Sequence, residues 1–213
     1  MILYRPTDGE IHTTPIRLRP RCAFIMSQLG GPVPEIVLDV RRSLLRLLSE
    51  HSYSALDADS LTTGKDFLLK IWQIVLSVPL GIAIVHEGIS HSTLANVFYE
   101  LGWMQAYGKE TIVIRAGEVS LPSDFVRTEY VPFDGHFERR LRAFLGGLAD
   151  QAEFYSTVAD QVERNPLLSI DYLRRAYLLT GEESLRRRAQ EVYAAAGVGE
   201  RAKTSVETLL TRF

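Results

Sequence analysis

The sequence predicts an α/β fold, an open parallel Rossmann-like (flavodoxin-like) sheet of about five strands, followed by a small all-helical C-terminal module. Two observations predict it. Short continuous apolar runs alternate with segments of helical spacing as far as residue 148, which is typical of strands buried on both faces of a parallel sheet. Beyond that point only helical spacing remains. We therefore expect an N-terminal arm at 1–21, an α/β domain at 22–148 and a helical module at 149–213.

The elements of the α/β domain follow from its apolar runs and turn residues. Pro132 places the last strand at the edge of the sheet, because proline cannot donate to a ladder of hydrogen bonds. The expected strands are 22–29, a segment within 52–59, 81–85, 111–114 and 129–134, and the expected helices are 34–50, 64–76, 90–107 and 136–146.

The composition limits the classes of function. The chain has 213 residues, of which 46% are hydrophobic and 23% charged, as in globular proteins. A formal net charge of −2 gives no argument for a nucleic-acid partner. A single cysteine, Cys22, excludes an internal disulfide and a cysteine-built metal site, and we expect no metal. No apolar run is long enough for a membrane helix and no signal-peptide pattern is present, so we expect a cytoplasmic protein without a membrane partner.

The most informative stretch is 81–114, which is predicted to form strand, loop, helix and strand. Ser90 or Ser92 can cap the helix, because a hydroxyl accepts a hydrogen bond from a free N–H group at its start. Gly108 ends the helix. Four apolar residues recur at helix spacing and are expected to face the sheet: Leu94, Val97, Leu101 and Met104.

One flank of this helix is the candidate site. Ser92, Asn96 and Glu100 are four residues apart and therefore share a side of the helix. That side lies near the carboxyl end of strand 81–85, where open parallel sheets bind their ligands. A glutamate on such a helix is, by itself, more often a solvated surface residue.

The sequence of this helix resembles a known family. Residues 96–102, NVFYELG, are followed by QAYGK at 105–109 and by an apolar strand. This pattern resembles the N-V-x-x-E-x-G helix of nucleoside 2-deoxyribosyltransferase-like proteins and of their TIR-like nucleotide-binding relatives. The resemblance covers residues 22–147 and implies a small nucleotide or nucleoside as the ligand.

The resemblance implies that Glu100 is a catalytic carboxylate at the anomeric carbon and that Asn96 positions sugar hydroxyls, with Tyr99 among the substrate-binding residues. A carboxylate there can trap or stabilise the oxocarbenium character that develops when a C–N glycosidic bond breaks. The implied activity is N-glycosidic bond cleavage or ribosyl transfer on a nucleotide, nucleoside or NAD. No cofactor is required, and NAD or a nucleotide is the substrate or ligand.

The loop after the central strand differs from that family. Deoxyribosyltransferases carry an aspartate before this strand and another after it, where this chain has residues 78–79 and 90–94. The loop contains His86, Glu87 and His91 instead. These side chains could supply a different acid or set of hydrogen bonds to the substrate.

Further binding candidates follow the first two strands. Ser27 and Gln28 stand where they could form hydrogen bonds with a base or ribose, and the N–H groups at Gly30 and Gly31 could hold a phosphate or carboxylate. A plain turn explains the two glycines equally well. Asp57 ends the second strand, where it could meet a ribose hydroxyl or only cap a loop.

The C-terminal module allows an alternative function. We expect helices at 150–164, 166–179 and 182–196 and a fourth that ends at Phe213, and residues 169–197 have the spacing of a tetratricopeptide-like (TPR-like) helix pair. We expect the module to make the chain a homo-oligomer. In the alternative function, the chain is a non-catalytic nucleotide-binding sensor or effector that assembles through this module, as the resemblance to TIR-like proteins of bacterial defence allows.

Overall fold

The computed structural model divides the chain into two compact units. One unit comprises residues 22–146, and the other joins Met1–Arg21 with Gly147–Phe213. The first 21 residues therefore group with the helical residues at the other end of the chain. Within these units the structure describes residues 4–12, 16–28, 31–57, 67–119 and 129–196.

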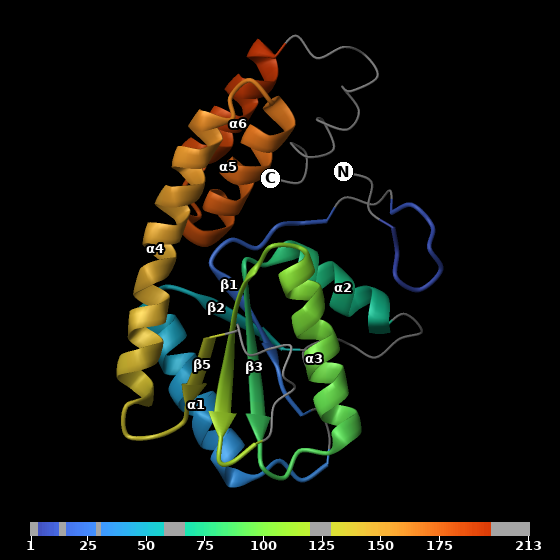
Figure 1. Ribbon diagram of the computed structural model, residues 1–213, viewed down its shortest axis with the longest axis vertical. Coiled ribbons are helices and arrows are strands. Elements are labelled where there is room, and N and C mark those ends of the chain that lie inside the picture. The colour runs from blue at the N-terminus through green and yellow to red at the C-terminus, as the bar shows by residue number, and fades with distance from the viewer. Residues whose placement is uncertain (1–3, 13–15, 29–30, 58–66, 120–128, 197–213) are drawn as a thin grey trace. The chain divides into compact units, whose positions relative to one another are not determined.

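The α/β unit is built on one parallel sheet (Figure 1). Among the described residues the strand order is β2-β1-β3-β4-β5, and every neighbouring pair is parallel. This order confirms the predicted open flavodoxin-like sheet, and β5 lies at its edge, as Pro132 predicts. The strands are β1 (Cys22–Met26), β2 (Ser54–Asp57), β3 (Leu80–His86), β4 (Glu110–Ala116) and β5 (Glu129–Pro132).

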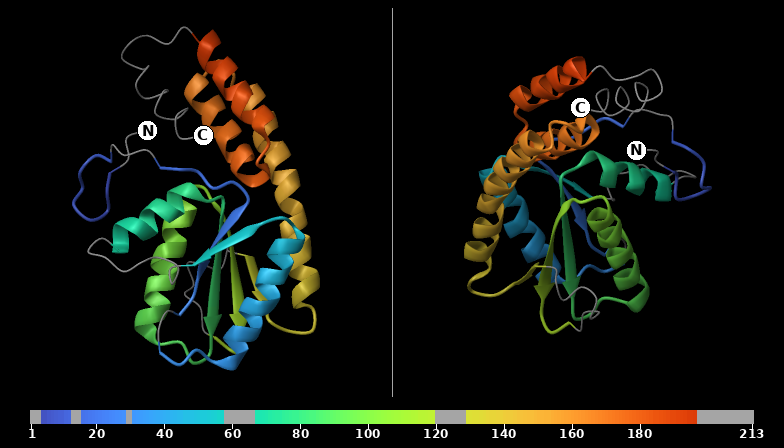
Figure 2. Two further views of the ribbon diagram at one scale, coloured as in Figure 1. Left: turned by 180° about the vertical axis from the view of Figure 1, so that it is seen from behind. Right: turned by 45° about the horizontal axis from the view of Figure 1, so that its top comes forward.

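Helices cover both faces of this sheet. α2 (Phe67–Ser77) and α3 (His91–Ala106) lie on one face, and α1 (Glu35–Glu50) lies on the other, as Figures 1 and 2 show from opposite sides. All seven residues of β3 and all five of β1 are buried, because both strands are covered on both sides. The buried stripe of α1 consists of Val37, Val40, Leu44, Leu47 and Leu48.

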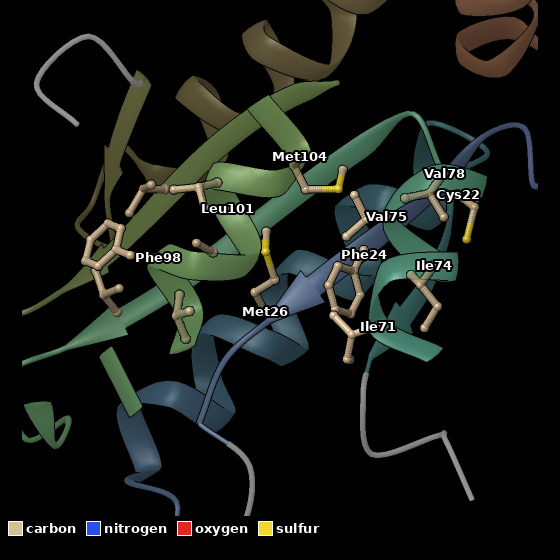
Figure 3. Packing of buried hydrophobic residues seen from close by; sticks show 14 residues of the cluster. Cys22, Phe24, Met26, Ile71, Ile74, Val75, Val78, Phe98, Leu101 and Met104 are labelled. Carbon is tan, nitrogen blue, oxygen red and sulfur yellow. The ribbon is translucent and has the colours of Figure 1, made fainter. Parts of the chain in front are cut away.

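The core beneath α2 and α3 holds these helices in place (Figure 3). Phe24 and Met26 of β1 pack there against Ile71 of α2 and Leu101 of α3, and all four are buried. Close packing also explains a glycine at the start of β3. A Cβ atom on Gly81 would lie 3.0 Å from the Met104 side chain and 3.1 Å from that of Met26.

The prediction of separate helices at 136–146 and 150–164 is wrong. α4 runs without a break from Phe137 to Gln161, through Gly146 and Gly147. Each glycine costs a helix interior about 1 kcal/mol relative to alanine, whereas full burial of a leucine contributes about 1.5–3 kcal/mol. Burial therefore outweighs the two glycines, since one stripe of buried residues continues across them: Leu141, Leu145, Leu148 and Ala152.

The second unit contains the C-terminal part of α4 together with α5 (Pro166–Thr180) and α6 (Glu183–Ala195). Asn165 caps α5 through its side chain, and Gly181 ends it in the left-handed conformation at φ 74°. The arm joins this unit through a 2.8 Å hydrogen bond from the Arg21 N–H to the Leu178 carbonyl. The predicted fourth helix lies outside the described residues. No described helix is both long and apolar enough to cross a membrane.

The continuous α4 makes a prediction about stability. A Cβ atom at Gly146 or Gly147 would meet nothing within 4 Å. We therefore expect the double substitution of both by alanine to raise the free energy of unfolding by about 1–2 kcal/mol, because alanine has less freedom to lose on folding. Urea unfolding followed by circular dichroism measures the change. Gly181→Ala is the control and should destabilise, since its φ of 74° is unfavourable for alanine. If the double variant is less stable than the wild type, α4 is not a continuous helix through residues 146 and 147.

Candidate functional site

The candidate site lies where β1 and β3 end. β1 pairs with β2 on one side and with β3 on the other, so the chain connections diverge between β1 and β3. In open α/β sheets this divergence leaves a crevice at the carboxyl ends of the strands, where ligands bind. Ser27 follows β1 directly, and His86 is the last residue of β3. The fold therefore gathers polar side chains at this edge.

A pocket of about 240 Å³ opens between α2, α3 and the end of β1. This volume is slightly below the roughly 300–1,000 Å³ of typical ligand sites. One part of its lining is polar and the rest is apolar or aromatic, as is usual for sites that bind small organic molecules. The lining residues are Ser27, Phe67, Leu68, Ile71, Thr93, Asn96, Val97, Tyr99 and Glu100.

The α3 helix orients the polar side of this pocket. Ser90 caps the helix by accepting a hydrogen bond from the Thr93 N–H at 3.2 Å. Val97, Leu101 and Met104 are buried against the sheet, which confirms three of the four predicted contacts, and Leu94 packs against the same core while partly buried. With these residues turned inward, Asn96 and Glu100 lie at the pocket.

Glu100 has an unusual electrostatic environment. Its side chain is partly buried, and burial raises its pKa from 4.5 to about 7. Among the residues that the structure describes, no cation and no hydrogen-bond donor compensates this cost. Burial disfavours the charged form of a carboxyl. A carboxyl with such a shift, in a pocket, is a candidate functional group.

Ser27 belongs to a second polar group that α1 completes. The Arg41 guanidinium donates one hydrogen bond to the Ser27 Oγ at 3.0 Å and another to the Asp57 Oδ2 at 2.5 Å. Arg41 and Asp57 are mostly buried, with 19% and 26% of their side chains exposed. The group therefore connects the ends of β1 and β2 beside the pocket.

Gln28 and His86 form a third polar contact at this edge. The His86 Nε2 lies 2.9 Å from the Gln28 Oε1, so Nε2 carries the proton when this amide oxygen accepts. His86 is 2% exposed, and burial lowers the pKa of its imidazole. The ring is therefore neutral at pH 7 and orients the Gln28 side chain.

The pocket brings together four of the predicted site residues: Ser27, Asn96, Tyr99 and Glu100. Its lining residues do not include six other candidates: Gln28, Gly31, Asp57, His86, Glu87 and Ser92. Gly30 lies outside the described residues.

Helix geometry explains why Thr93 lines the pocket instead of Ser92. At 3.6 residues per turn, Ser92 and Glu100 are rotated about 80° apart, whereas Thr93 and Glu100 are only about 20° apart. Ser92 instead lies with its hydroxyl 3.1 Å from that of Ser90. A count of seven residues back from Glu100 would have predicted Thr93.

The sequence did not predict Arg41 as part of the site. Its partners Ser27 and Asp57 are 14 and 16 residues away in the chain, and no local pattern marks the pair. Phe67, the first residue of α2, was not predicted as a site residue either, and it is 40% exposed and lines the pocket. Among the described residues, no group of three or more His, Cys, Asp or Glu side chains could hold a metal ion.

Comparison with known proteins found likeness in structure. No family model matches the chain, and no curated protein matches it. The chain is similar in structure to the Clostridium botulinum CMP N-glycosidase BcmB, with 18% sequence identity and a TM-score of 0.42. The likeness covers 58% of this chain and 98% of that one. The fold described above rests on the strand order and pairing of this chain alone.

The buried carboxyl predicts how stability depends on pH. Because the pKa of Glu100 is about 7 in the folded state and 4.5 ordinarily, the folded state binds the proton more tightly. Stability is therefore lost as the pH rises from 4.5 to about 7. Glu100→Gln removes this loss of stability, because the glutamine side chain does not ionise. We expect the variant to be more stable than the wild type by ~1–3 kcal/mol at about pH 8 and nearly equal to it at about pH 4.

Urea unfolding at both pH values measures this difference. The matched control is Glu191→Gln, which changes an exposed glutamate on α6 and should leave both values unchanged. A Glu100→Gln variant that is less stable than the wild type at the higher pH would show that Glu100 is not desolvated.

Proposed function

We propose that the chain cleaves an N-glycosidic bond, or transfers the ribosyl group, of a nucleotide, nucleoside or NAD. The observation that carries this proposal is the position of Glu100, a desolvated carboxyl without a cation partner among the described residues. It shares its pocket with the Asn96 amide and the Ser27 hydroxyl, at the edge of the sheet where ligands bind.

The chemistry of the bond explains why a carboxylate serves there. When the C–N bond breaks, its electron pair goes to the base and positive charge develops on the anomeric carbon. An ionised Glu100 can stabilise that charge or attack the carbon and form a glycosyl ester. Water then supplies a hydroxyl to the sugar and a proton to the base in hydrolysis, whereas a second base takes the sugar in transfer.

The rest of the lining fits the two parts of such a substrate. Asn96 carries both a donor and an acceptor, so its amide can bind two vicinal sugar hydroxyls. Phe67 and Tyr99 are 40% and 52% exposed at the pocket and offer ring faces for a base. The proposed division is therefore sugar at Asn96 and Glu100, and base at the aromatic rings.

Replacement of the carboxylate tests the proposal. Glu100→Gln keeps the size of the side chain and removes the charge that faces the anomeric carbon. We expect the rate of base release to fall by about 10²–10³ while the protein stays folded. The assay incubates the pure protein with NAD, the common ribonucleosides and deoxyribonucleosides, and their 5′-monophosphates, CMP included, and separates free base by chromatography.

Two results decide the role of Glu100 in this assay. Glu191→Gln, on an exposed face of α6, is the control and should keep the wild-type rate. If Glu100→Gln stays within a few-fold of the wild type, Glu100 is not the catalytic carboxylate. If the wild type releases no base from any compound, the chain is not an N-glycosidase for these substrates.

The pH dependence of the rate identifies the form of Glu100 that acts. An ionised nucleophile requires the deprotonated form, so kcat/KM should rise as the pH passes the pKa of about 7. We expect this limb to persist in Glu87→Ala and His91→Ala. These exposed residues lie in the turn after β3 and at the start of α3, and they could supply an acid instead. Loss of the limb in either variant would assign the titration to that residue, and a limb that falls through pH 7 would make Glu100 an acid.

A non-catalytic nucleotide sensor is the second candidate. The raised pKa favours it in one respect, because about half of Glu100 is protonated at its pKa of about 7 and a neutral carboxyl can donate a hydrogen bond to a base. A sensor would bind a nucleotide more weakly as the pH rises through 7 and release no base. The helical unit would then assemble the chain on binding, which light scattering with and without nucleotide would detect.

A further inference from the structure

The Ser27 hydroxyl is buried, and among the described residues it accepts a hydrogen bond but donates none. The side chain is 6% exposed and lines the pocket that contains Glu100. Its oxygen accepts a hydrogen bond from the Arg41 Nη1 at 3.0 Å. Within the part of the chain that the structure describes, no acceptor receives the hydrogen of this hydroxyl. Buried polar hydrogens are normally paired, so this one is available to a ligand.

Arg41 determines the direction of that hydrogen. A guanidinium has only donors and cannot accept a hydrogen bond, so the Ser27 oxygen is necessarily the acceptor in their contact. The hydroxyl hydrogen must therefore point away from Arg41. The positive charge of Arg41 also polarises the O–H bond, which strengthens the hydrogen bond that Ser27 donates.

Arg41 is itself held in place. Its Nη2 donates to the Asp57 Oδ2 at 2.5 Å, and the two side chains form an ion pair at the end of β2. A guanidinium that makes two bonds in a fixed fork has little rotational freedom. Arg41 therefore reaches Ser27 from a position that α1 and β2 define jointly.

We infer that Arg41 is a positioning residue, which makes Ser27 a hydrogen-bond donor to an acceptor atom of the ligand. The inference rests on the proposed function, since it assumes that the pocket binds a nucleoside or nucleotide. The atom that Ser27 meets carries a lone pair and no hydrogen, as do a ring nitrogen or carbonyl oxygen of a base. In bond cleavage such an atom gains electron density, so the hydrogen bond strengthens as the base departs.

A double-substitution cycle tests this role. The variants are Ser27→Ala, Arg41→Met and the two combined, and each is assayed with the compound of the base-release panel that the wild type cleaves fastest. We expect each single change to lower kcat/KM by roughly ten-fold, and the double change to lower it no further, because Arg41 acts through Ser27. Arg41→Lys should restore part of the loss, since an ammonium on the same helix can still donate to Ser27.

Arg42→Met is the matched control. Arg42 is the next residue of α1, its side chain is 72% exposed, and it pairs with Asp39 on the same helix. Its replacement should leave kcat/KM unchanged. Circular dichroism melts of all variants report on folding separately, so a general loss of structure cannot be mistaken for the expected effect.

The outcomes separate this inference from the proposed function. If the wild type is active and the two single losses multiply in the double variant, Arg41 does not act through Ser27 and the inference is wrong. The same holds if Arg41→Met keeps the wild-type kcat/KM, or if Arg41→Lys is as poor as Arg41→Met. If the wild type neither binds nor cleaves any compound of the panel, both the proposed function and the inference fail.

Discussion

The parallel pairing of β1 with β3 is the constraint on which the rest of the structure depends. The two strands lie in register from Ala23 opposite Leu80 to Met26 opposite Ala83, and both are buried on both faces. A shift by one residue would exchange the side chains of the two faces, so packing against the helices fixes the register. Because both strands run the same way, the residues that follow them, with Ser27 first, reach one edge of the sheet together. The site exists because this pairing does.

The same packing also positions Glu100, whose carboxyl is partly removed from water. Val97, Leu101 and Met104 turn one face of α3 into the core and so fix the rotation of the helix. Glu100 lies between two of these buried residues in sequence, Val97 and Leu101, so the backbone that carries it is fixed at the pocket. Apolar burial of the order of several kcal/mol thus opposes the cost of desolvating one carboxyl. A carboxyl kept in an environment that disfavours its charged form lowers the stability of the fold. Such a loss of stability is common at functional sites.

The sequence predicted the sheet well because the three central strands, β1, β3 and β4, contain continuous apolar runs, and Pro132 predicted the edge. It predicted Asn96 and Glu100 because a helix repeats nearly every four residues, but over eight residues the rotation accumulates and Thr93 replaces Ser92. It failed at α4, where Gly146 and Gly147 suggested a break that a buried stripe overrides. Arg41 could not be predicted, since its role depends on the pairing of β1 with β2, a tertiary contact.

The neighbouring charges explain why burial dominates the pKa of Glu100 among the residues that the structure describes. Arg41 donates a hydrogen bond to Ser27, and Ser27 lines the same pocket as Glu100. An arginine so placed would favour the ionised carboxyl if its charge were uncompensated. Asp57 pairs with it at 2.5 Å and neutralises it, and burial alone then shifts the pKa of Glu100 upward. The Arg41–Asp57 pair therefore directs the Ser27 hydroxyl without adding net positive charge beside the pocket. In the proposed reaction, added positive charge there would oppose the charge that develops on the sugar.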